Sequence, residues 1–267
     1  MTEKRERSAW ERVKMARKME RTRSEAYIHA LFTDFIELHG DRCFGDDHAL
    51  LAGLAFFEGL PVTVLAQNRG QCLEENIERN FGMMHPEGYR KALRLAKQAE
   101  KFGRPVITFV DTAGAYPGIG AEERGQALAI AECLKVFSDL KVPVICFVIG
   151  EGGSGGALAL SVADRIFMLD NAVYSILSPE GFASILWKDD SRAEEAASVM
   201  ELTAYDLMRK GIVDGIISEP EQGAEQCPEY VITQMKQLLE TTLSTLLKKK
   251  TSQLLTERYQ KFRKIGV

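Results

Sequence analysis

Short apolar runs alternate with amphipathic segments along most of this chain. The runs at 105–110 and 143–149 are apolar at nearly every position, which is typical of strands covered on both faces. Strands that alternate with helices predict an α/β fold. We expect strands at 50–57, 61–66, 105–110, 143–149, 166–169 and 172–177.

Helical spacing of apolar residues fills most of the intervals between these strands. The clearest case is 86–102, where Pro86 suits the first turn of a helix and Gly103 suits its end. The segment 4–23 is rich in Lys and Arg, and we expect a solvated helix face there, with partner docking as the alternative. The expected helices are 3–37, 86–102, 122–140, 156–162, 179–187, 193–210 and 229–262.

Composition narrows the class of protein. The chain has 267 residues, a formal charge of −4 and five cysteines, none of them in a Cys-x-x-Cys pair. The charge gives no reason to expect nucleic acid as a partner, and the cysteine spacing argues against a zinc site. No apolar stretch approaches the ~20 residues of a membrane span, and no signal core precedes the first helix. We therefore expect a soluble cytoplasmic protein.

Two glycine-rich turns are the strongest chemical signal. The first glycine turn, 111–120 (DTAGAYPGIG), and the second glycine turn, 150–156 (GEGGSGG), each follow an apolar strand and open a helix. A helix N-terminus offers unpaired N–H groups and a partial positive charge, and glycine lets an anion approach them. We expect the N–H groups of Gly155 and Gly156 to face an oxyanion. The plainer alternative is that the glycines only permit tight packing.

The second glycine turn also matches two other motifs. Its residues 150–155 fit the dinucleotide-binding fingerprint, with Asp170 as the acid after the next strand, although the following helix is short and the acid comes early. Its residues 152–156 fit the nucleophile elbow of hydrolases, but no histidine follows Ser154. Ser154 is more simply a helix N-cap. Both motifs stay open as weaker alternatives.

The charged residues beside the turns show no convincing carboxylate pair for acid–base catalysis. Asp111 ends a strand and is expected to cap its own turn. The other charges near the turns are expected to be ordinary capping and helix-dipole residues; they are Glu122, Glu123, Arg124 and Glu151.

Four long motifs closely resemble the carboxyltransferase α subunit of the multisubunit bacterial acetyl-CoA carboxylase. They are 80–94 (NFGMMHPEGYRKALR), 111–126, 148–157 and 178–188 (SPEGFASILWK). A further segment, 203–214, is similar to one found across the crotonase superfamily. The chain departs from the family in its shorter N-terminal extension and in Ala113, where Pro is common.

The resemblance implies a crotonase-like (ClpP/crotonase) spiral of ββα units with N- and C-terminal helices. The expected division is an N-terminal helical extension (1–40), a carboxyltransferase domain (41–220) and a C-terminal helix (221–267). By the same resemblance, Gly155 and Gly156 form a backbone oxyanion hole for carboxybiotin. Residues expected to line the substrate pocket are Gly114, Ala115, Gly118, Gly152 and Gly153.

The family also implies an activity: transfer of the carboxyl group from carboxybiotin, on the biotin carboxyl carrier protein, to acetyl-CoA. The product is malonyl-CoA, in the first committed step of fatty acid biosynthesis. The implied partners are a β subunit, in an α2β2 assembly, and biotin carboxylase. Zinc is expected on the β subunit only, with no metal or cofactor bound by this chain. A self-sufficient crotonase-type enzyme and a non-enzymatic scaffold are the alternatives.

Overall fold

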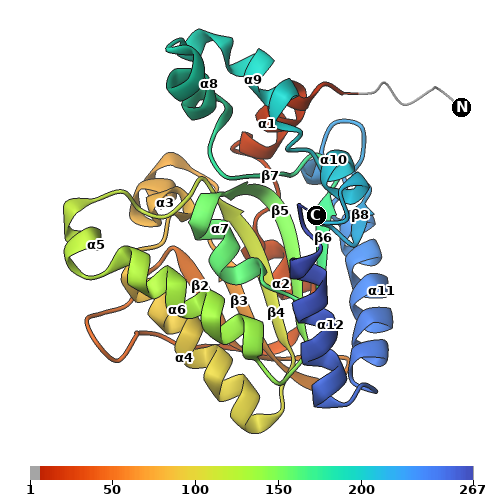
Figure 1. Cartoon of the computed structure of the whole chain (residues 1–267). Helices are drawn as coiled ribbons and strands as arrows, with labels where there is room; N and C mark the ends of the chain where they lie inside the picture. Colours follow the sequence, from red (N-terminus) through yellow and green to blue (C-terminus); the bar gives the residue numbers. More distant parts are fainter. Residues whose placement is uncertain (1–6, 267) are drawn as a thin grey trace, which may run out of the picture.

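The computed structural model describes residues 7–266, which form one mixed sheet of eight strands with helices on both faces (Figure 1). The strand order is β1-β2-β3-β4-β5-β6-β8, and β7 pairs with the end of β5. The first three strands are antiparallel, and the rest run parallel. The bounds are β1 (Thr33–Glu37), β2 (Leu50–Phe57), β3 (Leu60–Gln67), β4 (Val106–Thr112), β5 (Val144–Gly153), β6 (Arg165–Leu169), β7 (Val173–Ser175) and β8 (Gly215–Ile217).

The α/β class and the six expected strands are confirmed, and β1 and β8 were not foreseen. β5 runs further than expected, to Gly153, because its last residues pair with β7. The second glycine turn is therefore mostly strand, and the chain changes from strand to helix between Gly153 and Ser154.

The helices cover both faces of the sheet. On β4, the Thr108 hydroxyl donates to the Leu160 carbonyl of α7, whereas the ring of Phe109 stacks on Tyr27 of α2. Because neighbouring residues of a strand point to opposite faces, α7 and α2 lie on opposite sides. The bounds are α1 (Ala9–Arg17), α2 (Ser24–Leu31), α3 (Leu73–Glu78), α4 (Pro86–Phe102), α5 (Ile119–Glu123), α6 (Gln126–Asp139), α7 (Ser154–Ser161), α8 (Pro179–Trp187), α9 (Ala193–Met200), α10 (Ala204–Arg209), α11 (Pro228–Leu246) and α12 (Thr251–Arg263).

Several expected helices are interrupted. The segment expected as one helix over 122–140 breaks at Gly125, which has a φ of +84°, and 193–210 breaks before a new capping box at Thr203. The expected C-terminal helix over 229–262 is two helices, α11 and α12, and the chain reverses direction sharply between them (Figure 1). The polar segment 68–85, expected to be irregular, contains the short helix α3.

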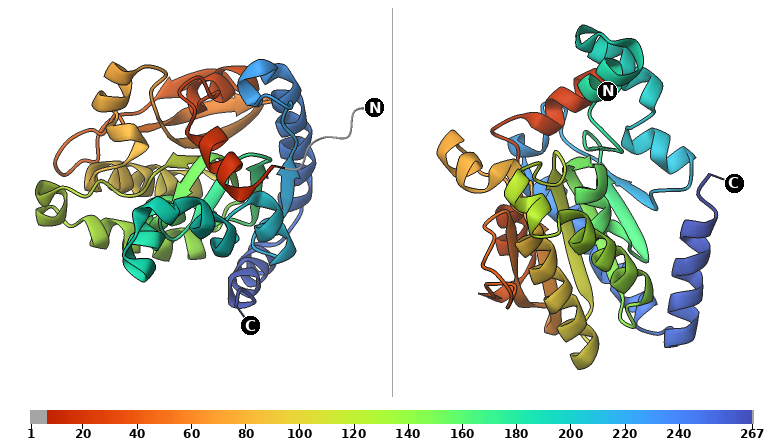
Figure 2. Two further views of the ribbon diagram at one scale, coloured as in Figure 1. Left: turned by 90° about the horizontal axis from the view of Figure 1, so that it is seen from above. Right: turned by 60° about the vertical axis from the view of Figure 1, so that its left-hand side comes forward.

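The expectation of a single helix over 3–37 is wrong within the described residues. The chain forms α1, a connector at 18–23, α2 and the edge strand β1, which pairs with β2. Apolar side chains of α1 join Val173, Ala197 and Leu202 in a small separate core. This core fixes α1 beside α9, and α8 and α9 project beyond the sheet (Figure 2). No described helix is both long and apolar enough to span a bilayer.

Candidate active site at the carboxyl ends of β4 and β5

The two glycine turns meet because β4 and β5 are parallel neighbours whose carboxyl ends lie at the same edge of the sheet. Their backbones are in direct contact. A Cβ atom added at Gly153 would lie 2.1 Å from the carbonyl oxygen of Ala113, and one at Gly156 would lie 2.5 Å from the carbonyl carbon of Gly114. Only glycine fits these two positions without moving the other turn. The glycines therefore join the two turns into one surface.

The other residues expected at the site take different places. Gly152 lies under the ring of Tyr174, where an added Cβ would be 2.7 Å from the ring edge. Gly155 has room, because a Cβ there would meet Ile130 at 3.6 Å, an ordinary contact. Ala115 is half-buried against the main core. Gly118 starts α5 and instead faces the ring of Tyr116.

Helix α7 begins abruptly at the end of β5. Gly153 is the N-cap, and Ser154, the first helical residue, has a φ of +54° in the left-handed region. The first N–H groups of a helix have no partner within the helix, so those near Gly155 and Gly156 are available at this edge. The expectation that Ser154 caps the helix is wrong, because its side chain makes no cap hydrogen bond. The Gly156 carbonyl is held by the Gln67 amide at 2.7 Å.

The two alternative motifs of the second glycine turn find no support in the geometry. No described side chain is hydrogen-bonded to the Ser154 hydroxyl, and the upstream His85 packs on Tyr116 with ring centroids 4.1 Å apart. Asp170 is 1% exposed and paired with Arg12 of α1, so it does not face a ribose. No three His, Cys, Asp or Glu side chains within residues 7–266 are grouped to hold a metal ion.

An apolar cavity of about 850 Å³ opens beside the start of α7. Ser154, Gly155 and Leu158 of α7 line it, together with Tyr174 of β7 and Phe182 of α8. The Tyr174 hydroxyl shares a 2.6 Å hydrogen bond with Ser161, and burial raises its pKa to about 12, so the phenol stays neutral at physiological pH. The pocket-lining Tyr174 and Phe182 were not found from sequence, because they come from segments beyond the glycine motifs.

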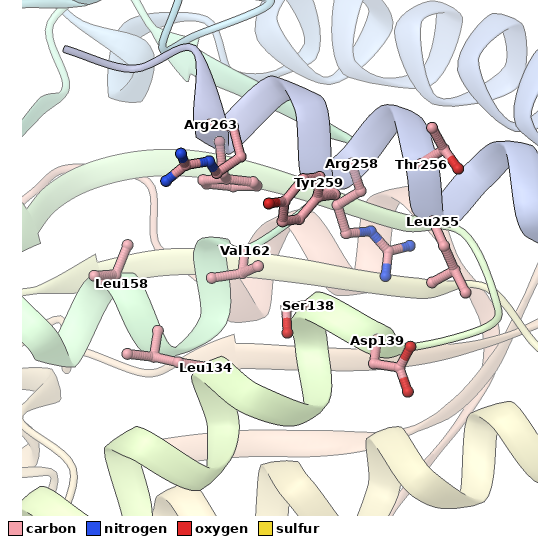
Figure 3. Close-up of a pocket in the computed structure, with 11 residues that line it drawn as sticks. Leu134, Ser138, Asp139, Leu158, Val162, Leu255, Thr256, Arg258, Tyr259 and Arg263 are labelled. Carbon is pink, nitrogen blue, oxygen red and sulfur yellow. The ribbon is translucent and has the colours of Figure 1, made fainter. Parts of the chain in front are cut away.

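A second cavity, of about 670 Å³, lies between α6 and α12 (Figure 3). Leu158 lines both cavities. Figure 3 shows Leu134 of α6, Leu158 of α7 and Val162, directly after α7, on one side, opposite Tyr259 of α12. The lining of this second cavity includes none of the glycines of the two turns. We therefore place the candidate site in the first cavity, beside Gly155.

A buried cluster of charges lies behind the second glycine turn. The Asp111 carboxylate is 1% exposed, accepts the Glu151 N–H at 3.1 Å and receives Arg23 at 2.7 Å. Desolvation acts to raise the pKa of Asp111, but Arg23 and Arg69 outweigh it and hold that pKa below its usual value. Asp111 therefore ties the second turn in place, and the expectation that it caps the first turn is wrong.

The arginines of the N-terminal segment complete this cluster. Arg17 donates to Glu151 at 2.7 Å and to Glu180 of α8 at 2.6 Å, and Arg69 binds the other oxygen of Glu151 at 2.7 Å. Buried arginines of this segment are Arg12, Arg21 and Arg23. The expectation of a solvated basic face is therefore wrong for much of 4–23, and Glu151 is a partner of Arg17 and Arg69 rather than an ordinary helix-start residue.

The fold defines a class of protein. Over 86% of this chain it matches the transcarboxylase 12S crystal structure, with a TM-score of 0.68 and 20% identity, although this chain spans only 43% of that one. A Pseudomonas malonate decarboxylase hetero-tetramer matches over 80% of this chain and 86% of its own, with a TM-score of 0.63 and 19% identity. The chain therefore has the crotonase-like fold of these carboxyl-handling enzymes, as expected from sequence.

Sequence comparison identifies the family. The model described as acetyl co-enzyme A carboxylase carboxyltransferase-like matches residues 4–266. The acetyl-coenzyme A carboxylase carboxyl transferase subunit alpha of Clostridium botulinum (strain Eklund 17B / Type B) is 60% identical over 97% of this chain and 94% of its own length. That of Clostridium acetobutylicum is 56% identical over the whole of this chain. The chain belongs to the family of acetyl-CoA carboxylase carboxyltransferase α subunits, and it is an enzyme component.

A fused relative supports association with a β subunit. In Natranaerobius thermophilus a protein named for carboxyl transferase subunits beta/alpha is 59% identical over 96% of this chain, which covers only 42% of that protein. Because α and β are there parts of one polypeptide, an α subunit of this family works beside a β partner.

Proposed function

We propose that this chain supplies the biotin side of a carboxyltransferase site that it shares with a β subunit. The observation that carries the proposal is the pair of joined glycine turns, where the start of α7 opens on an apolar cavity. N–H groups fixed at a helix start stabilise a developing oxyanion. The apolar wall suits a bicyclic ring and lowers competition from water for the same N–H groups.

In the proposed reaction, the bond between the ureido nitrogen and the carboxyl group of carboxybiotin breaks. Carbon dioxide is released, and the electron pair leaves an oxyanion on the biotin ureido group. This anion takes a proton from the methyl group of acetyl-CoA, and the resulting enolate attacks carbon dioxide to give malonyl-CoA. Biotin itself acts as the base, which agrees with the lack of a convincing acid–base pair in the sequence.

The residues of the two glycine turns have different proposed roles. The N–H groups of Gly155 and Gly156 hold the ureido oxygen, and loss of one such donor costs roughly 3–4 kcal/mol of transition-state stabilisation. The remaining pocket residues shape the wall and the approach; they are Gly114, Ala115, Gly118, Gly152 and Gly153.

The β subunit completes the proposed site. It holds the thioester oxygen and most of the CoA, and it carries the zinc. Ile119, near the end of the first glycine turn, and Ile176, directly after β7, are 80% and 77% exposed. Apolar side chains so exposed beside a site favour cover by a partner. We propose an α2β2 assembly that receives carboxybiotin from the carrier protein after biotin carboxylase has charged it.

The test compares the KM values for the two substrates in the complex with the β subunit. Gly155→Ala adds a methyl group where there is room, at the wall of the cavity. We expect the KM for biocytin to rise several-fold in malonyl-CoA decarboxylation, with the KM for malonyl-CoA unchanged. A rise confined to the KM for malonyl-CoA would contradict the assignment of this turn to biotin.

A further inference from the structure

Strand β5 is held at both ends by a buried Asp–Arg pair. At its start, Asp164 accepts the Val144 N–H at 2.8 Å and receives Arg258 at 2.7 Å. At its end, Asp111 accepts the Glu151 N–H at 3.1 Å and receives Arg23 at 2.7 Å. The two pairs have the same chemistry and similar burial, but only the second adjoins the glycine turns.

At the Asp111 end of β5, further contacts surround the Asp–Arg pair. A Cβ added at Gly150 would lie 2.3 Å from the Asp111 carboxylate, so that carboxylate packs directly on the turn backbone. Arg69 lies 2.7 Å from Glu151 and 3.6 Å from Asp111, and therefore joins the two acids. Arg17, the last residue of α1, also binds Glu151.

The second glycine turn leads into a strained backbone conformation that must be held by its surroundings. Ser154 lies in the left-handed region at φ +54°, and strained backbone persists only where the surroundings fix it. Buried ion pairs contribute little net stability compared with apolar packing. The buried charges lie at the end of β5 that leads into the strained Ser154. We therefore explain this cluster by the backbone geometry that it imposes rather than by a gain in stability.

We propose that Asp111 is a positioning residue for carboxyl transfer. Its charged carboxylate, fixed by Arg23 and Arg69, holds residues 150–153 against the first glycine turn. The N–H groups at the start of α7 then stay aimed at the oxyanion, although Asp111 touches no substrate. This inference rests on the proposed function for its effect on rate.

The kinetic test compares Asp111→Asn with the matched control Asp164→Asn in the complex with β. A small displacement of catalytic groups costs about 100-fold in rate, so we expect kcat for malonyl-CoA decarboxylation to fall about 100-fold in Asp111→Asn. The KM for malonyl-CoA stays unchanged, because its contacts are on β. Asp164→Asn keeps kcat within about twofold. Equal loss in both variants, or none in Asp111→Asn, overturns the proposal.

Amide hydrogen exchange provides a readout that does not depend on activity. Asp111→Asn is expected to speed exchange at 150–156 at least tenfold and to leave 144–148 unchanged, whereas Asp164→Asn shows the reverse. If the wild-type complex transfers no carboxyl group, the proposed function fails, yet this measurement still decides whether Asp111 holds the turn. Unchanged exchange at 150–156 overturns the positioning role.

A milder pair of variants covers the case in which Asp111→Asn does not fold. Arg69→Gln removes the charge that joins Asp111 and Glu151, and Arg69→Lys keeps a positive charge there. We expect faster exchange at 150–156 and a lower kcat in Arg69→Gln, with partial recovery of both in Arg69→Lys. Identical behaviour of these two variants, at wild-type values, overturns the proposal.

Discussion

At the scale of single residues, Gly155 and Gly156 are neighbours with different constraints. The methyl group of an alanine at Gly156 would meet the backbone of Gly114 and Ala115, which cannot move without disturbing the first glycine turn. At Gly155 the nearest atoms belong to the Ile130 side chain, at ordinary contact distance. The sequence pattern treats the two glycines alike, because their difference comes from a contact between turns about 40 residues apart.

This difference predicts opposite outcomes for two small substitutions. Overpacking of a rigid site costs typically 1–3 kcal/mol, so we expect Gly156→Ala to lower the free energy of unfolding by about that amount. Gly155→Ala should stay within about 1 kcal/mol of the wild type, since alanine at a compatible position is neutral or stabilising. Urea denaturation of the two variants measures both values. Equal destabilisation would show that the contact between the turns is not as tight as described.

At the scale of elements, the buried central strands were predictable, whereas the N-terminal segment and the edge strand β1 were not. Strands such as β4 and β5 are buried along their whole length, so their apolar runs carry the signal. The connector at 18–23 carries buried arginines whose acid partners lie far away in the sequence, for example Glu219 for Arg21. A local pattern of charge cannot distinguish such a segment from a solvated helix. Asp111 and Glu151, acids at the ends of buried strands, were the available hint.

The buried pair between Arg21 and Glu219 tests this account of the connector. Both side chains are fully buried, and Arg21 also donates to the Ile149 carbonyl. Removal of one partner leaves an unpaired buried charge, which costs about 3–5 kcal/mol. We expect Arg21→Ala to lower the free energy of unfolding by that amount in urea denaturation.

The control is Glu195→Ala, which breaks an exposed pair with Arg192. Exposed pairs contribute little because water and salt screen them, so this variant should be indistinguishable from wild type. A mild effect of Arg21→Ala, similar to that of the control, would mean that the connector is not held as the structure describes.

At the scale of the whole molecule, the fold places both glycine turns and the open cavity at one edge of the sheet. The crotonase-like class followed from the long motifs of 80–94 and 148–157 rather than from periodicity, which gave only α/β. The pocket wall formed by β7 and α8 could not be predicted, because it depends on how the chain crosses the sheet edge. The division at residues 40 and 220 stays a prediction.

The central claim is that this chain holds one half of a shared active site. The most direct measurement is malonyl-CoA decarboxylation in the presence of biocytin, for the chain alone and after mixing with a β subunit of the same family. We predict activity only in the mixture, because in the proposed division the chain supplies the glycine turns and β supplies the CoA contacts. Activity of the chain alone would contradict this account and favour a self-sufficient crotonase-type enzyme. A stable complex without activity would contradict it in favour of a scaffold.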